Sequence, residues 1–119
     1  MSQDLLKTGV AVGGTIGTNL VVTVDSTVAN GVKLPAAATN FAFGVTQMES
    51  AVGKTITVQT EGEALIKCSA TVARGAFVKY GTDGRIATAS ATDTAIGVVL
   101  KGADANELAR VYIARQLAV

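Results

Sequence analysis

The feature that most constrains the fold is a succession of short runs rich in β-branched residues, each broken by Gly, Asn or Asp after a few positions. Val and Thr fit the pleated surface of a strand, whereas Gly, Asn and Asp favour turns. Ala, Val, Thr and Gly fill more than half of the 119 positions, and no long helix fits anywhere. The pattern predicts an all-β fold: a small β-barrel or β-sandwich of short antiparallel strands with at most one or two short helical turns.

Two hairpins are expected. Asn30-Gly31 separates the β-like segments 26–29 and 32–34, and Asn-Gly suits a two-residue turn because both positions tolerate positive φ. The second hairpin joins 76–80 to 85–88 across Gly-Thr-Asp-Gly at 81–84, which suits a type I turn. The segment 69–75 is a candidate for one helical turn, with a Ser at its N-cap and a Gly at its end.

The segment 54–60 alternates between apolar and polar residues, which predicts a strand. Ile56 and Val58 would face the core, and Thr55, Thr57 and Gln59 would face solvent. After Glu61-Gly62 the segment 64–68 reads as a separate strand. Further strands are expected at 7–12, 20–24, 41–46, 95–100 and 109–114.

A faint internal repeat joins the two halves of the chain. Phe43-Gly44-Val45 aligns with Ile96-Gly97-Val98 at an offset of 53 residues, and the same offset places Val58 on Val111. Each copy reads as a strand, a loop of about ten residues and a second strand. The repeat suggests that one half of a small barrel or sandwich resembles the other.

Length and charge limit the broad class. A chain of 119 residues is about one domain, so we expect a single β-rich domain over 9–119, preceded at 1–8 by an N-terminal arm or a lead-in to the first strand. The net charge of +1 argues against a nucleic-acid surface, which needs clustered Lys and Arg. No secretory signal and no membrane-spanning segment are recognised, so we expect a soluble protein, with the cytoplasm as the default compartment.

The residue inventory leaves little room for catalysis. Without His there is no histidine base and no Ser-His-Asp arrangement, and the one Cys cannot form an internal disulfide or a thiolate zinc site. Cys68 lies in an apolar segment and is interpreted as a buried small side chain. We therefore expect no catalytic residues, no cofactor and no metal.

Four segments or residues are weaker candidates for a functional site, and each also has a structural interpretation. The Gly-rich segment 13–18 lacks the Lys and the following helix of a phosphate loop, so it is interpreted as a β-connection. Glu61 and Glu63 could form an acid pair or a metal site, but a solvated strand end is favoured. Asp83 is assigned to its turn. Lys67 lies within a strand rather than in the exposed turn of a lipoyl-type domain.

The few aromatic residues and the low proportion of charged residues also limit the possible functions. Five aromatic side chains barely fill one small core, so core packing is favoured over a stacking platform for bases or sugars. Charged residues are 16% of the chain, which predicts a tendency to associate.

Five segments carry a resemblance to a known family: Gly9-Val10-Ala11, Phe43-Gly44-Val45-Thr46, and the ranges 74–86, 94–100 and 109–113. In their order and spacing, from about residue 9 to residue 113, the sequence resembles the capsid decoration proteins of tailed bacteriophages, also called cement or head-stabilising proteins.

The resemblance implies a structural protein of the virion. Such a protein forms homotrimers on the capsid exterior and clamps neighbouring major capsid proteins, and it is present in the host cytoplasm during assembly. It implies no catalytic residue, no nucleic acid and no membrane. Within this reading, Ser2, Gln3, Asp4, Leu5 and Leu6 are candidate capsid or subunit contacts, as an arm that orders on a neighbour; an ordinary terminus or first strand is the alternative.

Three other functions stay open. A phage tail or head-completion subunit would share the β composition. A cellular ligand-binding β-barrel would need a deep apolar pocket. An enzyme would have to work through its dispersed carboxylates alone.

Overall fold

The computed structural model describes residues 5–25, 27–35, 42–90 and 94–118. This part of the chain holds nine strands and no helix, which confirms the all-β prediction. The strands are β1 (Leu5–Ala11), β2 (Val21–Val24), β3 (Gly31–Lys33), β4 (Ala42–Thr46), β5 (Thr55–Lys67), β6 (Phe77–Tyr80), β7 (Ile86–Thr88), β8 (Thr94–Lys101) and β9 (Leu108–Ala118).

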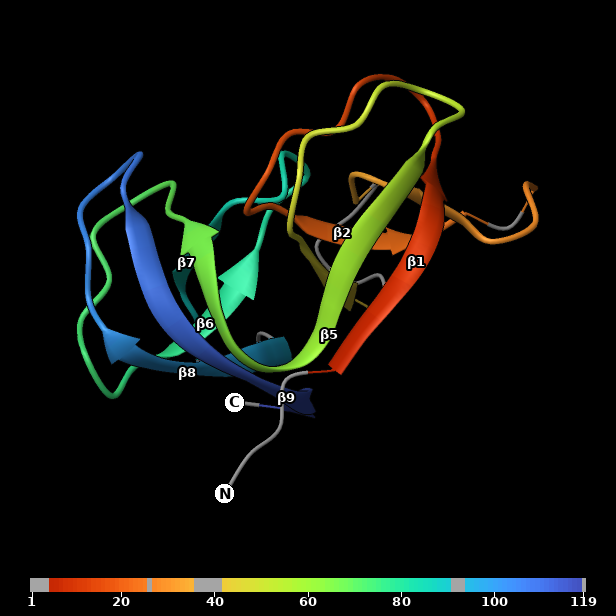
Figure 1. Cartoon of the computed structure of the whole chain (residues 1–119). Helices are drawn as coiled ribbons and strands as arrows, with labels where there is room; N and C mark the ends of the chain where they lie inside the picture. Colours follow the sequence, from red (N-terminus) through yellow and green to blue (C-terminus); the bar gives the residue numbers. More distant parts are fainter. Residues whose placement is uncertain (1–4, 26, 36–41, 91–93, 119) are drawn as a thin grey trace.

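The long strand β5 takes part in two closed rings of strands (Figure 1). The first ring runs β1–β5–β4–β2–β3, and a parallel pair between Ala11 and Val32 returns β3 to β1. The second ring runs β5–β9–β8–β6–β7, and a parallel bridge between Cys68 and Ile86 returns β7 to the end of β5. We call β1–β4 with residues 55–60 the N-terminal lobe, and residues 61–67 with β6–β9 the C-terminal lobe.

The two lobes have the same strand pairing, which confirms the predicted repeat. In the N-terminal lobe, Val45 pairs with Gln59 across β4 and β5. In the C-terminal lobe, Val98 pairs with Tyr112 across β8 and β9, so both partners are shifted by the predicted 53 residues. The repeated unit is therefore a five-stranded ring, and the described part of the chain contains two of them.

The equivalence also extends to the closures and loops. The pair Ala11–Val32 corresponds to the bridge Cys68–Ile86. The antiparallel bridge Ile16–Ser50 corresponds to the bridge Val72–Ala103. Because the connecting loops differ in length, the offset is not constant along the chain, and the sequence reveals the repeat only in its later strands.

Each lobe has its own hydrophobic core. The cluster of the N-terminal lobe contains Ala11, Ile16, Val22, Val32, Ile56 and Val58, with Leu34 and Phe43 packed against it. The cluster of the C-terminal lobe is larger and includes Ile66, Val78, Ile86 and Val111. Val21 and Val45 of the N-terminal lobe also belong to this second cluster, so the two lobes are packed against each other.

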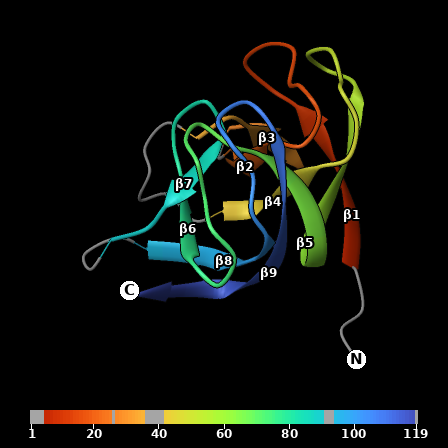
Figure 2. The same ribbon diagram turned by 90° about the vertical axis from the view of Figure 1, so that its left-hand side faces the viewer.

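The predicted break at Glu61-Gly62 is wrong, because β5 continues through it. Gly62 has a φ of +99°, a value open to Gly, and the strand curves here from one ring into the other (Figures 1 and 2). Ile56 and Val58 face the core as predicted. Gln59 is buried rather than solvent-facing as predicted: it lies at the junction, where its Nε2 donates to the carbonyls of Glu61 and Glu63.

The first hairpin exists, but its strands and turn differ from the prediction. β3 pairs with β2 rather than with 26–29, and the connection is a loop of residues 25–30. Asn30 has a φ of +59°, whereas Gly31 lies at the start of β3. The Asp25 carboxylate accepts hydrogen bonds from the loop, which stabilises this wider connection. Residue 26 lies outside the described residues.

The second hairpin is confirmed. β6 and β7 are joined through a turn in which the Gly84 amide donates to the Gly81 carbonyl over 2.9 Å, and Gly84 has a φ of +79°. The predicted helical turn at 69–75 is wrong: Val72 bridges to Ala103, and only the turn that ends at Gly75 remains. Tertiary pairing of Val72 outweighs the local capping signal.

Candidate functional site

The acidic side chains of the described residues are dispersed. No group of three His, Cys, Asp or Glu side chains among residues 5–25, 27–35, 42–90 and 94–118 could hold a metal ion. Glu61 and Glu63 are both exposed on β5, where Gly62 separates them at the bend. Both are exposed as predicted, but they lie in the middle of β5 rather than at a strand end.

Asp25 organises the loop between β2 and β3. Its Oδ2 accepts hydrogen bonds from the Thr27 hydroxyl at 2.7 Å, the Thr27 amide at 3.0 Å and the Val28 amide at 2.9 Å. Lys33 Nζ lies 3.7 Å from Oδ1. The Thr27 hydroxyl bond is the main cause that lowers the pKa of Asp25, and the amides and Lys33 add to it against the opposing effect of burial.

Asp83 has the turn role that the sequence predicts. Partial burial would raise its pKa, but hydrogen bonds from Arg85 outweigh burial and lower it. The Arg85 side chain binds Asp83 through Nε and through Nη2, both at 2.7 Å, and it donates from Nη1 to Asn106 at 2.6 Å. These groups connect the β6–β7 turn to the β8–β9 loop, which is a structural task.

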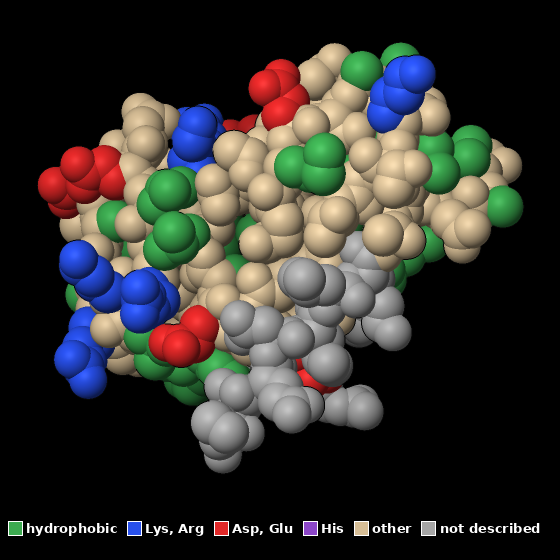
Figure 3. All heavy atoms as spheres, in the orientation of Figure 1, with side chains coloured by type: hydrophobic (Ala, Val, Ile, Leu, Met, Phe, Trp, Pro, Cys, Tyr) green, Lys and Arg blue, Asp and Glu red, His purple; other side chains and the backbone are tan. Residues whose placement is uncertain are grey.

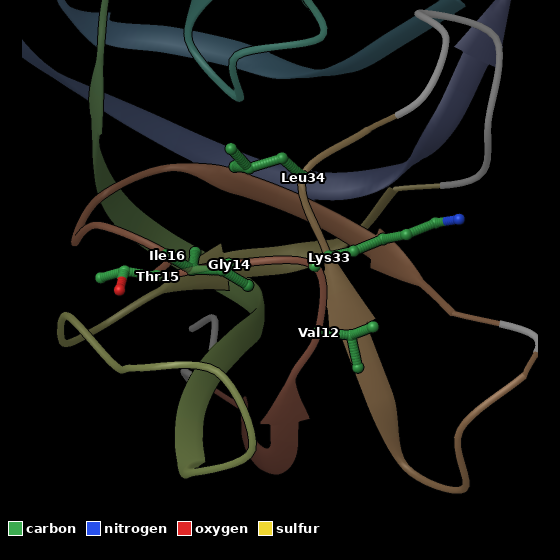
Figure 4. Close-up of a pocket in the computed structure, with 7 residues that line it drawn as sticks. Val12, Gly14, Thr15, Ile16, Lys33 and Leu34 are labelled. Carbon is green, nitrogen blue, oxygen red and sulfur yellow. The ribbon is translucent and has the colours of Figure 1, made fainter.

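The Gly-rich segment lines a small depression at one end of the N-terminal lobe (Figure 4). Its volume is about 170 Å³, below the range of about 300–1,000 Å³ that is usual for ligand pockets. In Figure 4 the Thr15 and Lys33 side chains point away from each other, so they do not converge on one ligand. The segment is a β-connection, as predicted, and it leads to a strand rather than a helix.

Two reactive side-chain types are buried in the C-terminal lobe. Cys68 is fully buried, as predicted, and burial raises the pKa of its thiol. Tyr80 is 2% exposed, and burial raises the pKa of its phenol. The Tyr80 hydroxyl finds no hydrogen-bond partner within the described part of the chain. Neither group is accessible for chemistry with an external substrate.

The C-terminal lobe presents an apolar and basic surface. Leu65 on β5 and Leu108 on β9 are 44% and 43% exposed, and Arg110 pairs directly with Leu65. Figure 3 shows hydrophobic side chains beside Lys and Arg side chains on this lobe, in the left half of the view. We call Leu65, Lys67, Leu108 and Arg110 the Leu65–Leu108 patch.

The equivalent surface of the N-terminal lobe is different. The pair of β1 and β5 that corresponds to Leu65–Arg110 is Thr8–Thr57, and Thr55 corresponds to Leu108. The backbone positions are the same, but three Thr side chains stand in place of two Leu and one Arg, and Val10 stands in place of Lys67. The backbone therefore does not require an apolar surface at this place, which distinguishes the patch as a candidate contact surface.

The predicted N-terminal contacts fall partly outside the described residues. Ser2, Gln3 and Asp4 lie there. Leu5 and Leu6 begin β1, where they pair with Glu61 and Gln59 of β5. The structure thus places two of the five candidate contacts in a strand of the N-terminal lobe.

The prediction that the aromatic residues fill the core holds in part. Tyr80 is buried and Phe43 packs against a core, but Phe77 is 45% exposed on β6, and Phe41 lies outside the described residues. Sequence analysis also missed the Leu65–Leu108 patch. The side-chain period of two places Leu108 and Arg110 on the same face of β9, so an apolar side chain beside a basic one on that face was the available signal.

No helix in the described part of the chain is long and apolar enough to cross a membrane.

Comparisons with known proteins agree with this architecture. A search of curated proteins gives no match. The solved structure titled "The crystal structure of head fiber gp8.5 N base in bacteriophage phi29" is similar in fold, with a TM-score of 0.76 over 98% of this chain and 100% of that chain, at 14% identity. The family model described as phage cement protein matches residues 3–114. The chain therefore belongs to the phage cement protein family.

Proposed function

We propose that the protein binds the outer surface of a phage capsid as a homotrimer and clamps neighbouring major capsid proteins. Membership in the cement family over residues 3–114 carries this proposal, since the family consists of capsid-binding structural proteins. The proposal includes the host cytoplasm as the place of assembly, and it includes neither catalysis nor a nucleic-acid or membrane partner. Many copies bound to one shell would give strong total attachment from modest single interfaces.

We propose the Leu65–Leu108 patch as the capsid-binding surface. Its two exposed Leu side chains supply apolar area, and Arg110 and Lys67 favour a partner with acidic side chains. The Thr8, Thr55 and Thr57 positions of the N-terminal lobe provide matched controls, because they occupy the equivalent backbone positions.

The experiment is co-sedimentation with expanded empty capsids that lack decoration protein. We expect saturable binding and a higher temperature of capsid disruption. Leu65→Asp and Arg110→Glu should weaken binding at least about tenfold, while Thr8→Asp and Thr57→Glu leave it unchanged. Absence of any binding by the wild-type protein would contradict the function, whereas equal loss in the control variants would contradict the choice of surface.

The N-terminal arm is tested separately. Deletion of residues 2–4 leaves β1 intact, because β1 begins at Leu5. If Ser2, Gln3 and Asp4 contact a neighbour, as we propose, the truncated protein should occupy fewer capsid sites at equal concentration and unfold at the same temperature. Unchanged occupancy would remove the arm from the proposal.

The alternative of a tail or head-completion subunit predicts rings that bind tail components and not the capsid surface. The alternative of a ligand-binding barrel needs a deep apolar pocket, and the depression around Val12 and Leu34, with a volume of about 170 Å³, is too small to be one.

A further inference from the structure

Three outward side chains of the C-terminal lobe form a continuous row across neighbouring strands. Phe77 on β6 pairs with Val98 on β8, and Val98 pairs with Tyr112 on β9. Phe77 is 45% exposed, and Val98 and Tyr112 are partly exposed. We call these three residues the outer row. An aromatic, a β-branched and a second aromatic side chain lie side by side and form an apolar strip, whose exposure to water is unfavourable.

The equivalent row of the N-terminal lobe is buried. Val21, Val45 and Gln59 are joined by the same cross-strand pairs and are 0%, 1% and 4% exposed. The C-terminal lobe covers this row: Val21 and Val45 share a hydrophobic cluster with Tyr80. The face that carries this row is therefore buried between the two lobes in the N-terminal lobe, whereas the equivalent face of the C-terminal lobe stays exposed.

The covering element is the hairpin of β6 and β7. The Gly84 carbonyl in its turn accepts a hydrogen bond of 2.8 Å from the Val21 amide. A Cβ at Gly84 would lie 2.8 Å from the Val21 carbonyl oxygen, so this approach requires Gly. Tyr80, at the end of β6, belongs to the same hydrophobic cluster as Val21 and Val45.

The equivalent hairpin of the N-terminal lobe is uncovered. Val24 takes the place of Tyr80, because Val24 pairs with Val32 as Tyr80 pairs with Ile86. Val24 is 56% exposed, and Val28 in the adjoining loop is 41% exposed. Each lobe therefore has one such row and one such hairpin. The outer row of the C-terminal lobe and the β2–β3 hairpin of the N-terminal lobe have no partner lobe within the molecule.

We propose that the outer row of one copy binds the β2–β3 hairpin of a second copy, so that the packing between lobes within one chain is repeated between chains. The two surfaces are different, so the contact is head-to-tail, and it produces a closed ring or an open chain. Continuity with the lobe interface identifies the occupant as a second copy of this chain. The inference concerns self-association in solution and does not depend on capsid binding.

The test uses two variants that each damage one surface. Phe77→Asp places a charge in the outer row but keeps the hairpin, and Val24→Asp damages the hairpin but keeps the outer row. Light scattering and sedimentation should show that the wild type self-associates and that each variant alone does so at least about tenfold more weakly. An equimolar mixture of the two variants should form a one-to-one dimer, because one intact row meets one intact hairpin.

Val52→Asp is the matched control, since Val52 is 58% exposed and lies outside both surfaces. It should assemble as the wild type does, and unfolding curves should show that all variants remain folded; Val28→Asp replaces Val24→Asp if the latter does not fold. A wild-type protein that stays monomeric over an about thousandfold concentration range overturns the inference. Normal assembly of both Val24→Asp and Val28→Asp would also overturn the inference, as would an equimolar mixture of Phe77→Asp and Val24→Asp that gives no dimer. Capsid binding of the same proteins is a separate readout: capsid binding by a protein that stays monomeric would leave the capsid-binding role standing and would remove the homotrimer together with this inference.

Discussion

Gly97 packs directly against the backbone carbonyl oxygen of Tyr112, so that no side chain fits at position 97. Gly44 has the same relationship to the carbonyl of Gln59 in the other lobe, and a Cβ there would also lie 2.6 Å from Val58 Cγ1. Both glycines have ordinary strand conformations. They are therefore required by the close approach of two strands rather than by backbone strain, and the repeat preserves that approach in both rings.

Gly44→Ala and Gly97→Ala should each destabilise the protein. The added methyl group meets backbone atoms that cannot move without breaking the strand pairing, so we expect a loss of about 1–3 kcal/mol in the free energy of unfolding. Urea denaturation measures this loss. The control is Gly17→Ala, whose Cβ would meet only Leu20 Cδ1 at 3.4 Å and should be neutral or slightly stabilising. Equal stability of all three variants would contradict the proposed close approach.

Removal of the Asp25 carboxylate should weaken the β2–β3 loop and change the response to acid. Hydrogen bonds from Thr27 lower the pKa of Asp25 in the folded state, so its contribution is complete at neutral pH and is lost as the pH falls below about 4. Asp25→Ala should lower the Tm by a few degrees at pH 7, and the difference from the wild type should shrink at about pH 3. Thermal unfolding across this range tests it, with Glu49→Ala, which removes an exposed carboxylate, as the control. A difference that is the same at both pH values would argue against the ionised form as the stabilising species.

Tyr80→Phe should preserve or increase stability. The Tyr80 hydroxyl is buried and has no hydrogen-bond partner among the described residues, so folding removes it from water without compensation. We expect the variant to be as stable as the wild type or more stable by up to about 2 kcal/mol in urea denaturation. A clear loss of stability would show that the hydroxyl binds a group such as a buried water molecule. Tyr112→Phe on the partly exposed outer row is the matched control and should change the stability little.

Cys68 should react with thiol reagents only after unfolding. Its side chain is fully buried and burial raises the pKa of the thiol, so both access and thiolate formation are disfavoured in the folded state. Labelling with a maleimide at pH 8 should be slow in buffer and fast in urea. Cys68→Ala should cost only about 1 kcal/mol, because the equivalent position of the N-terminal lobe is Ala11. Rapid labelling of the native protein would show that the end of β5 opens easily.

Local sequence patterns predicted the elements that depend on neighbouring residues. The alternation at Ile56 and Val58 identified a strand and its buried face, and the Gly81–Gly84 turn was correct because its geometry is set within four residues. The resemblance carried by the glycine-centred segments led to the right family. The pattern could not show that β5 passes through Glu61-Gly62, since a glycine with positive φ can bend a strand as well as end it.

The sequence by itself determined the all-β class, the turn at Gly81–Gly84 and the apolar side of the strand at Ile56 and Val58, because these depend on backbone preferences and on a side-chain period of two. Only the tertiary structure decided what covers each side. Val21 and Phe77 occupy equivalent positions, yet Val21 is buried beneath the second lobe and Phe77 is exposed. Burial of an outward face depends on contacts between residues far apart in the chain, and the alternation along a single strand carries no information about those contacts.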